Sequence, residues 1–215
     1  MAARQRITAC LTVSAASSNP DGTLHLDITA TSIPEVLVIT PKRHGDARGF
    51  FSESWNRSAM AQAGLDLDFV QDNHSLSRAA GTIRGLHFQT PPHAQAKLVR
   101  CGRGALLDVA VDIRKGSPTY GKWVAEELSF ENGRQLLVPV GFAHGFVTLT
   151  QDTEIIYKCT DYYAPACDRA LRFDDPAIGI DWGITRDAAV LSDKDAAAPM
   201  LSDLDNPFTY EGRAT

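Results

Sequence analysis

The feature that most constrains the fold of this chain is a long series of short, strand-like segments with little helical pattern between them. Apolar residues alternate with polar ones or form short runs, and Gly, Pro or Asn separates the runs at near-regular spacing. The predicted strands are residues 36–39, 49–54, 69–75, 82–89, 97–101, 105–113, 122–128, 135–139, 145–149 and 154–160. Because helices do not alternate with these strands, the pattern favours an antiparallel sandwich or barrel over a βαβ sheet.

One segment in the first half of the chain has a helical pattern. Residues 56–63 begin at the potential cap Asn56, contain alanines and Met60, and end before Gly64, which predicts a helix. Beyond residue 176 the pattern is mixed. Residues 177–182 predict a turn and a short strand, and residues 191–195 are polar enough to form a loop.

Length and charge limit the class of protein. The 215 residues fit one domain with a sizeable core, or a domain with a tail. The net charge of -5 argues against general attraction to nucleic acid or to an anionic membrane, and no apolar run is long enough to cross a bilayer. We therefore expect neither as a partner. An anionic ligand would have to be held locally, for example by arginines.

The N-terminal residues and the cysteines bear on domain organisation and compartment. Residues 1–25 are basic, then mildly apolar, and end in a turn-forming stretch, so they predict a disordered or loosely packed extension of a single domain over residues 26–215. The apolar part is too short and too interrupted to favour a cleaved signal. The cysteines show no paired spacing, which predicts free thiols and a cytoplasmic protein; they are Cys10, Cys101, Cys159 and Cys167.

The predicted strand at residues 83–89 contains a candidate catalytic histidine. Strand alternation places Arg84 and Leu86 on one face and His87 on the other. A histidine titrates near neutral pH, and a nearby lysine such as Lys97 could stabilise negative charge on an oxygen. That pair suits removal of a proton next to a carbonyl. A core histidine with one hydrogen bond and a surface lysine would explain the same residues.

Two further groups would complete such chemistry. A carboxylate bonded to the second ring nitrogen of the histidine would fix its tautomer. The sequence leaves five candidates open for it, namely Asp72, Asp108, Asp112, Asp175 and Asp195. Tyr157 is a candidate proton donor on a strand whose opposite face carries Glu154 and Lys158, although a core tyrosine with a bonded hydroxyl is the commoner explanation.

A metal site is the alternative for a small barrel with several histidines. Residues 139–144 resemble the second metal motif of the cupin barrels, in which a histidine follows a Pro-x-Gly turn. The first cupin motif needs two histidines one residue apart and then a glutamate, but Phe88 and Gln89 follow His87. The sequence therefore predicts a cupin-like barrel without the metal site.

Phosphate binding would have to come from side chains. Arg48 and Arg84 each stand beside a glycine and could hold a diphosphate through paired N–H donors, although each could equally form a surface ion pair. The chain has no glycine-rich phosphate motif of the dinucleotide or P-loop type. The adjacent Tyr162 and Tyr163 could stack on a base or serve only packing.

Taken together, a set of motifs in unbroken order between residues 27 and 200 resembles the dTDP-4-dehydrorhamnose 3,5-epimerase family. The motifs are GDARGFF at 45–51, FVQDNHS at 69–75, RGLHFQ at 84–89, AQAKLVR at 94–100, GFAHGF at 141–146, YK at 157–158, IGIDW at 178–182 and LSDKD at 191–195. Ala96 and Gly183 depart from the family pattern conservatively.

The resemblance implies an all-β, cupin-like jelly-roll barrel with a few short helices, working without metal or cofactor. It also implies a homodimer in which exchanged N-terminal strands help to complete each site. By match to the family, His87 is the general base paired with Asp195, Tyr157 is the acid, and Lys97 steadies the enolate oxygen. The matching substrate-binding residues are Arg48, Glu53, Gln71, Asn73, Arg84, His144 and Lys194, with Tyr163 stacking on thymine. Asp168 replaces a ligand-binding glutamate, which puts that contact in question.

The expected reaction is inversion of C3 and C5 of dTDP-4-dehydro-6-deoxy-D-glucose, giving dTDP-4-dehydro-L-rhamnose for dTDP-L-rhamnose biosynthesis. The main alternative is a relative that inverts only C3 or C5 of such a dTDP-sugar in a secondary-metabolite pathway. A metal-dependent cupin oxygenase is disfavoured by the missing histidine pair. A non-catalytic nucleotide-sugar-binding barrel would not need both His87 and Tyr157.

Overall fold

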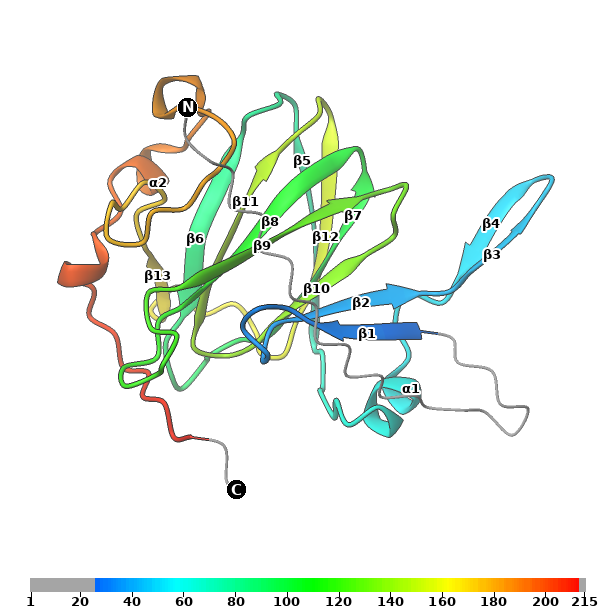
Figure 1. The fold of residues 1–215 in the computed structure, drawn as a ribbon, viewed down its shortest axis with the longest axis horizontal. Coiled ribbons are helices and arrows are strands. Elements are labelled where there is room, and N and C mark those ends of the chain that lie inside the picture. Colours follow the sequence, from blue (N-terminus) through cyan, green and yellow to red (C-terminus); the bar gives the residue numbers. More distant parts are fainter. Residues whose placement is uncertain (1–25, 213–215) are drawn as a thin grey trace.

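Two antiparallel sheets that face each other form the body of the molecule in a computed structural model, which describes residues 26–212 (Figure 1). The first sheet has the strand order β1-β2-β10-β7-β12-β5, and the second has the order β13-β6-β11-β8-β9. The predictions for residues 1–25 and for Cys10 fall outside the described residues.

The six-stranded sheet contains β1 (Leu26–Ala30), β2 (Leu37–Pro41), β5 (Gln71–Ser77), β7 (Lys97–Arg103), β10 (Gln135–Val138) and β12 (Thr153–Cys159). The five-stranded sheet contains β6 (Ile83–Gln89), β8 (Ala105–Asp112), β9 (Trp123–Ser129), β11 (Phe142–Thr148) and β13 (Asp168–Ala170). Strands β3 (Arg43–Asp46) and β4 (Gly49–Ser52) form a separate hairpin. The helices are α1 (Arg57–Gln62), α2 (Asp193–Ala196) and the 3-10 turns Arg186–Ala188 and Leu201–Asp203.

This arrangement confirms the all-β, cupin-like jelly roll with a few short helices. The helix predicted at residues 56–63 is α1, whose first turn is capped by the Asn56 side chain accepting from Ala59 N–H at 3.1 Å. No strand forms at residues 177–182, where Trp182 instead packs into the core and donates its indole N–H to Phe173 O. No helix within residues 26–212 is long and apolar enough to span a membrane.

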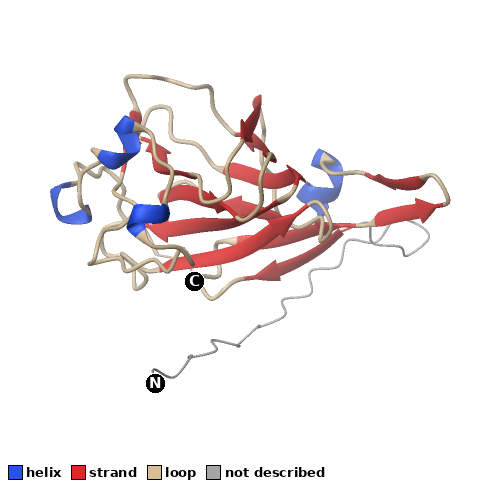
Figure 2. Cartoon of the chain, turned by 90° about the horizontal axis from the view of Figure 1, so that it is seen from above, coloured by secondary structure: helices blue, strands red, loops and turns tan. Residues whose placement is uncertain are grey.

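Two apolar cores sandwich the five-stranded sheet. One lies between the two sheets and includes Val99, Leu106 and Ile155. The other lies on the outer face, where β6 packs against the C-terminal segment that carries α2 (Figure 1). Seen from above, short helices lie at the end of the molecule opposite to the projecting two-stranded hairpin (Figure 2). Because successive strand residues alternate between these cores, polar side chains on the inner face must lie inside the barrel.

The alternation breaks within β6, and this corrects the predicted direction of Arg84. Ile83 and Leu86 both pack in the outer core, whereas Arg84 and His87 both line an inner cavity. The pairing of β6 with β11 shifts register beside Gly85, whose backbone approaches Gly145 so closely that a Cβ would lie 2.5 Å from the Gly145 Cα. Because of this irregularity, the residues before Gly85 lie on the strand face opposite to the one that regular alternation predicts. Arg84 therefore does not share a face with Leu86.

Candidate active site

The candidate active site is formed by two adjoining cavities of about 500 Å³ and 260 Å³ inside the barrel. Four residues line both cavities, namely His87, Lys97, Tyr157 and Lys194. His87 comes from the five-stranded sheet, while Lys97 and Tyr157 come from the six-stranded sheet. Groups from the two sheets therefore face each other across one space.

The His87 imidazole is bonded to a buried carboxylate that lies 108 residues later in the chain. His87 Nε2 is 2.5 Å from Asp195 Oδ1, and only 5% of the Asp195 side chain is exposed. Burial alone would raise the pKa of Asp195, but hydrogen bonds from His87, Ser192 and the Gly85 N–H, with the charge of His87, hold that pKa below its usual range. The sequence left five aspartates as candidate partners of the His87 ring, and Asp195 is the one that lies beside it.

Lys97 reaches across the barrel to the strand that carries the histidine. Its Nζ donates to the His87 carbonyl oxygen at 3.3 Å. Burial lowers the pKa of Lys97, while the nearby charges of Asp108 and Asp168 oppose that shift. The ammonium group of a half-buried lysine is held by protein groups in place of water. Such a group is well placed to bind a developing oxyanion.

Tyr157 lies on β12, with its ring against the inner core and its side chain lining both cavities. Glu154 and Lys158 on the same strand instead form ion pairs with groups outside the cavities, as the alternation predicts. Burial raises the pKa of the Tyr157 phenol, so it remains protonated through neutral pH. The phenol is therefore available as a proton donor.

His144 and Asp108 form a second buried pair beside the first. His144 on β11 lies opposite His87 on β6, and its Nε2 is 2.8 Å from Asp108 Oδ1 on β8. Burial lowers the pKa of His144, against the opposing effect of the Asp108 charge. Asp108, one of the five candidate partners of His87, is therefore hydrogen-bonded to His144 instead.

The smaller cavity collects most of the predicted nucleotide-binding residues. Gln71, Asn73, Tyr163, Asp168 and Lys194 all line it. Asp168 accepts from Lys194 Nζ at 2.5 Å and from the Tyr163 hydroxyl at 3.4 Å, so its carboxylate joins two of these residues.

Arg84 lines the larger cavity and is anchored by the neighbouring strand. Its Nε donates to Ser77 Oγ at 3.1 Å, and its guanidinium also donates to the Leu76 carbonyl oxygen at 3.3 Å. Arg84 therefore lies on the cavity wall, on the strand face opposite to the one that alternation predicted, and its role in binding stays a prediction.

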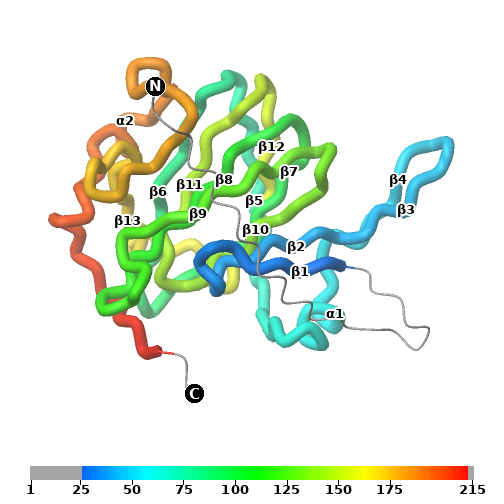
Figure 3. The backbone as a smooth tube through the Cα atoms, viewed as in Figure 1, coloured from blue at the N-terminus to red at the C-terminus, as the bar shows by residue number. Residues whose placement is uncertain are grey.

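Arg48 and Glu53 are not part of these cavities. They belong to the β3–β4 hairpin and the residue that follows it, and the hairpin projects away from the barrel (Figure 3). The Arg48 side chain is 90% exposed and pairs with Asp46, while Glu53 accepts from Asn56. Within one chain, these two predicted ligand-binding residues are separate from His87.

Comparison with known proteins identifies the family. Residues 30–203 match the family model described as dTDP-4-dehydrorhamnose 3,5-epimerase. The chain belongs to this epimerase family. It is 58% identical over 183 residues to the dTDP-4-dehydrorhamnose 3,5-epimerase of Sinorhizobium fredii, covering 83% of this chain and 91% of the relative.

Solved epimerase structures share the fold. A 3,5-epimerase from Legionella pneumophila in complex with dTDP-4-keto-L-rhamnose superposes with a TM-score of 0.82 at 45% identity, covering 87% of this chain and all of the other. A 3'-monoepimerase from Streptomyces bikiniensis in complex with dTDP-quinovose gives a TM-score of 0.74 at 36% identity, covering 80% and 87%. Epimerases of both kinds are therefore built on this barrel.

Residue-level reasoning missed the structure around Asp195. Residues 191–195, predicted as a loop, contain the start of α2, because the Ser192 side chain caps the helix by accepting from Asp195 N–H. The signal was present as Ser-x-x-Asp, a helix-capping pattern that lacked only an apolar run after it. Among residues 26–212, no group of three or more His, Cys, Asp or Glu side chains could hold a metal ion.

Proposed function

We propose that this chain inverts C3 and C5 of dTDP-4-dehydro-6-deoxy-D-glucose to give dTDP-4-dehydro-L-rhamnose, in dTDP-L-rhamnose biosynthesis. The observation that carries the proposal is the placement of His87–Asp195 and Tyr157 on facing sheets of one cavity, with Lys97 beside them. Inversion needs a base on one side of a carbon and an acid on the other. The identity of 58% to a 3,5-epimerase, against 36% to a monoepimerase, favours action at both carbons.

His87 acts first, as the base. An ionised Asp195 accepts the Nε2 proton of the imidazole, so the neutral ring keeps its lone pair on Nδ1. The ketone at C4 of the sugar acidifies the hydrogens on both neighbouring carbons. Nδ1 takes one of these protons, the C–H electron pair forms the enolate, and the resulting imidazolium is stabilised by Asp195.

Lys97 and Tyr157 complete the inversion. The Lys97 ammonium stabilises the enolate oxygen, which carries the negative charge only after the proton has left. The Tyr157 phenol then donates its proton to the same carbon from the opposite face. Proton exchange with water returns His87 to its neutral form and Tyr157 to its phenol form, and the cycle repeats at the second carbon.

We propose that the thymidine end of the substrate occupies the smaller cavity, with Tyr163 against the base and Gln71 and Asn73 as hydrogen-bonding groups. Arg84, fixed on the wall of the larger cavity, would then bind phosphate oxygens. Asp168 acts in this arrangement by holding Lys194 and Tyr163 in place. Its own contact with the ligand, in doubt from the sequence, is secondary.

We further propose that the protein is a homodimer in which the β3–β4 hairpin of each chain brings Arg48 and Glu53 to the site of the other. Support comes from their separation from the cavities and from Phe51 on the hairpin, whose 72% exposure leaves a large aromatic surface uncovered. The hairpin contacts the barrel through Arg43, which donates to the Glu131 carbonyl oxygen at 2.8 Å, and through Phe50, whose ring centroid lies 5.7 Å from that of Phe130.

Subunit complementation tests this dimer. Arg48→Ala and His87→Ala chains carrying different tags are co-expressed and the mixed dimer is purified. One of its two sites then has both native residues if the hairpin acts on the partner, so we expect about half of the wild-type activity, well above either parent. A mixed dimer no more active than its parents would contradict the exchange.

We propose residues 26–215 as the catalytic domain, since the family match lies within them. Removal of residues 1–25 should leave turnover unchanged. We also propose a cytoplasmic enzyme, in keeping with the free thiols of Cys101, Cys159 and Cys167.

Proton NMR of dTDP-4-dehydro-6-deoxy-D-glucose with the wild-type protein in D₂O tests the reaction itself. We expect the signals of the hydrogens on C3 and C5 both to disappear and the L-configured product to be trapped by a reductase. Loss of one signal would indicate a single-centre epimerase instead. Retention of both would contradict the proposed function.

A further inference from the structure

Backbone hydrogen bonds join the segment that carries Asp195 to the strand that carries His87. This contact lies a few residues before Asp195 in one segment and a few residues before His87 in the other. Val190 forms a parallel bridge with Thr82, with Ile83 N–H donating to Val190 O at 3.0 Å and Val190 N–H donating to Gly81 O at 2.9 Å. Two residues after this bridge the chain turns at Ser192 into α2. Only a short stretch of chain therefore separates the Asp195 carboxylate from the point at which its segment is fixed beside the start of β6.

Helix α2 cannot orient Asp195 by itself, because four residues are far too few for a stable isolated helix. Its first turn depends on Ser192. The Ser192 side-chain oxygen accepts the Asp195 N–H at 3.2 Å, and the Ser192 carbonyl accepts the Ala196 N–H at 3.0 Å. The backbone of Asp195 is thus held by the residue that starts the helix.

Ser192 also influences the charge of the Asp195 carboxylate. Burial would raise the pKa of Asp195, whereas hydrogen bonding with His87, Ser192 and the Gly85 N–H lowers it. Gly85 belongs to β6, two residues before His87, and Ser192 stands two residues after the bridge that joins Val190 to Thr82. Loss of the hydroxyl removes the cap that orients the Asp195 backbone and one of the groups that stabilise its buried charge.

We propose that Ser192 is a positioning residue, which aims the Asp195 carboxylate at His87 Nε2 and so keeps the imidazole in one tautomer. The inference rests on the proposed role of His87 as the base. With the carboxylate displaced, the proton of the neutral ring would divide between Nε2 and Nδ1, and rings with Nδ1–H cannot accept the substrate's proton there. Catalysis would suffer although no substrate contact had been removed.

The competing role for Ser192 is direct contact with the substrate, since it lines the larger cavity. Steady-state kinetics separate the two. We expect Ser192→Ala to lower kcat about tenfold with little change in KM, and Ser192→Thr, which keeps a capping hydroxyl, to restore most of the rate. Ser58→Ala is the matched control, because Ser58 is exposed on α1 and only accepts a hydrogen bond from Gln62. A raised KM with unchanged kcat would overturn the proposal.

A second measurement needs no turnover. The ¹⁵N shifts of the His87 ring, assigned by comparison with His87→Asn and recorded without ligand at a pH where the imidazole is neutral, report which nitrogen carries the proton. We expect the Nε2–H form in wild type, Ser192→Thr and Ser58→Ala, and a mixture of both tautomers in Ser192→Ala. An unchanged tautomer in a folded Ser192→Ala protein would refute the positioning role. Inactivity of the wild type on the tested sugar would instead refute the proposed function and leave this result intact.

Discussion

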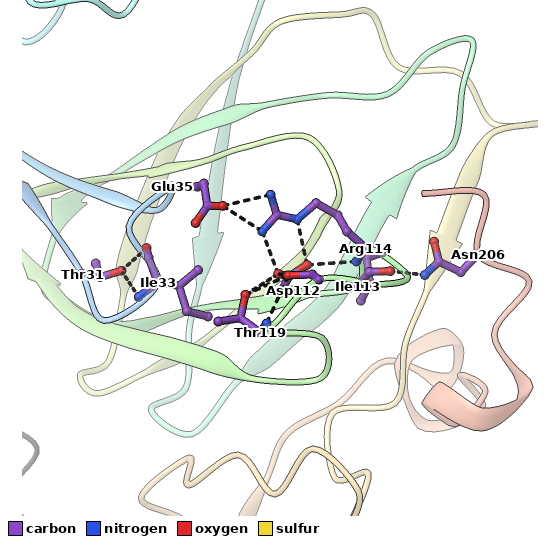
Figure 4. A network of polar contacts seen from close by, with 9 residues as sticks. Thr31, Ile33, Glu35, Asp112, Ile113, Arg114, Thr119 and Asn206 are labelled. Carbon is purple, nitrogen blue, oxygen red and sulfur yellow. Dashed lines mark hydrogen bonds and ion pairs between the residues drawn. The ribbon is translucent and has the colours of Figure 1, made fainter. Parts of the chain in front are cut away.

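Strand β8 carries two buried aspartates in opposite circumstances, Asp112 at its last residue and Asp108 in its middle. Asp108 and Asp112 both point between the sheets, and neither carboxylate is exposed. Asp112 accepts from Arg114 Nε at 2.9 Å and Nη2 at 2.7 Å, and from the hydroxyls of Ser117 and Thr119 at 2.6 Å each (Figure 4). Asp108 accepts only from His144, and its Oδ2 has no partner among residues 26–212.

The site around Asp112 is structural. Arg114 also donates to Glu35 at 3.3 Å and lies over the rings of Phe142 and Tyr210, so one network ties the β1–β2 loop and the C-terminal segment to β8. Burial alone would raise the pKa of Asp112, but the hydrogen bonds from Arg114 and the two hydroxyls lower it. A carboxylate with all its acceptors filled stabilises the fold.

The site around Asp108 serves the cavity. The charge of Asp108 helps the half-buried Lys97 remain cationic, and its histidine partner lines the larger cavity. Such an arrangement costs stability, because buried polar groups are left incompletely satisfied. Burial of a charge therefore does not by itself distinguish a structural from a functional residue; the completeness of its hydrogen bonding does.

The largest effect on turnover is expected in the cavity that Asp108 supports. His87→Ala should lower kcat by about 10²- to 10⁴-fold, the usual contribution of a positioned base. It should also lower the melting temperature, because the buried Asp195 carboxylate loses its partner. This loss should be smaller than that of Asp112→Asn, since the His87 side chain is 31% exposed and water can replace it. Steady-state assays and thermal unfolding measure both. His74→Ala, which alters an exposed histidine paired with Glu154, is the control. An active His87→Ala enzyme would reject the assignment of the base.

Lys97→Met should follow, with a loss of about 10²- to 10³-fold in kcat, as for removal of an oxyanion-stabilising donor. Because burial lowers the pKa of Lys97, the charged form is disfavoured by its surroundings, and the apolar substitute should leave the melting temperature unchanged or raise it. A variant that loses stability together with activity would show that Lys97 is structural and would remove the contrast between the sites around Asp108 and Asp112.

Asp112→Asn should have the largest effect on stability. Breaking a buried pair costs about 3–5 kcal/mol in the free energy of unfolding, whereas kcat of the folded variant should stay near wild type. Urea titration measures the first, and assays below the transition measure the second. A variant as stable as wild type would contradict the structural role of the Asp112 network.

The same variant makes a prediction about pH. In the folded chain the pKa of Asp112 lies below its unfolded value of about 3.8, so between the two values the unfolded state binds more protons. The stabilisation from this carboxylate is therefore complete above the unfolded pKa and is lost as pH falls through the folded one. In Asp112→Asn, the free energy of unfolding should therefore fall less steeply as the pH is lowered through this range. If the fall is as steep as in wild type, other carboxylates cause it.

Asp108→Asn should change stability much less than Asp112→Asn. The amide oxygen can still accept from His144, and a buried charge with an unpartnered oxygen is removed, so the free energy of unfolding should change by no more than about 1.5 kcal/mol. Turnover should fall moderately, since Lys97 loses a supporting charge. Urea titration of both variants gives the comparison, and equal losses would contradict the distinction between the two aspartates.

Local patterns predicted much of this molecule. The strands from β5 to β12 lie near their expected positions, and His87, Lys97 and Tyr157 face the interior because apolar alternation determines which side of a strand is buried. The pairing of His87 with Asp195 could not be deduced from residues alone, because it joins positions 108 apart and depends on how the C-terminal segment crosses the barrel. Family resemblance, not pattern, singled out that aspartate.

Two errors have clear physical causes. The face of Arg84 depends on a register shift beside Gly85 that no alternation rule contains. Helix α2 has a cap but no amphipathic repeat, so its residues resembled a polar loop. Arg48 and Glu53 are a different case, since the chemistry proposed for them requires a second chain.

In the proposed mechanism, His87 and Tyr157 act on opposite faces of the same carbon. Proton NMR of the substrate in D₂O with Tyr157→Phe is the decisive measurement. We predict that this variant still exchanges the hydrogens on C3 and C5 for deuterium, through His87, but returns the deuteron to the same face, so that the sugar is labelled without inversion. His87→Ala should show neither exchange nor inversion. Normal inversion by Tyr157→Phe, or exchange by His87→Ala, would contradict the account.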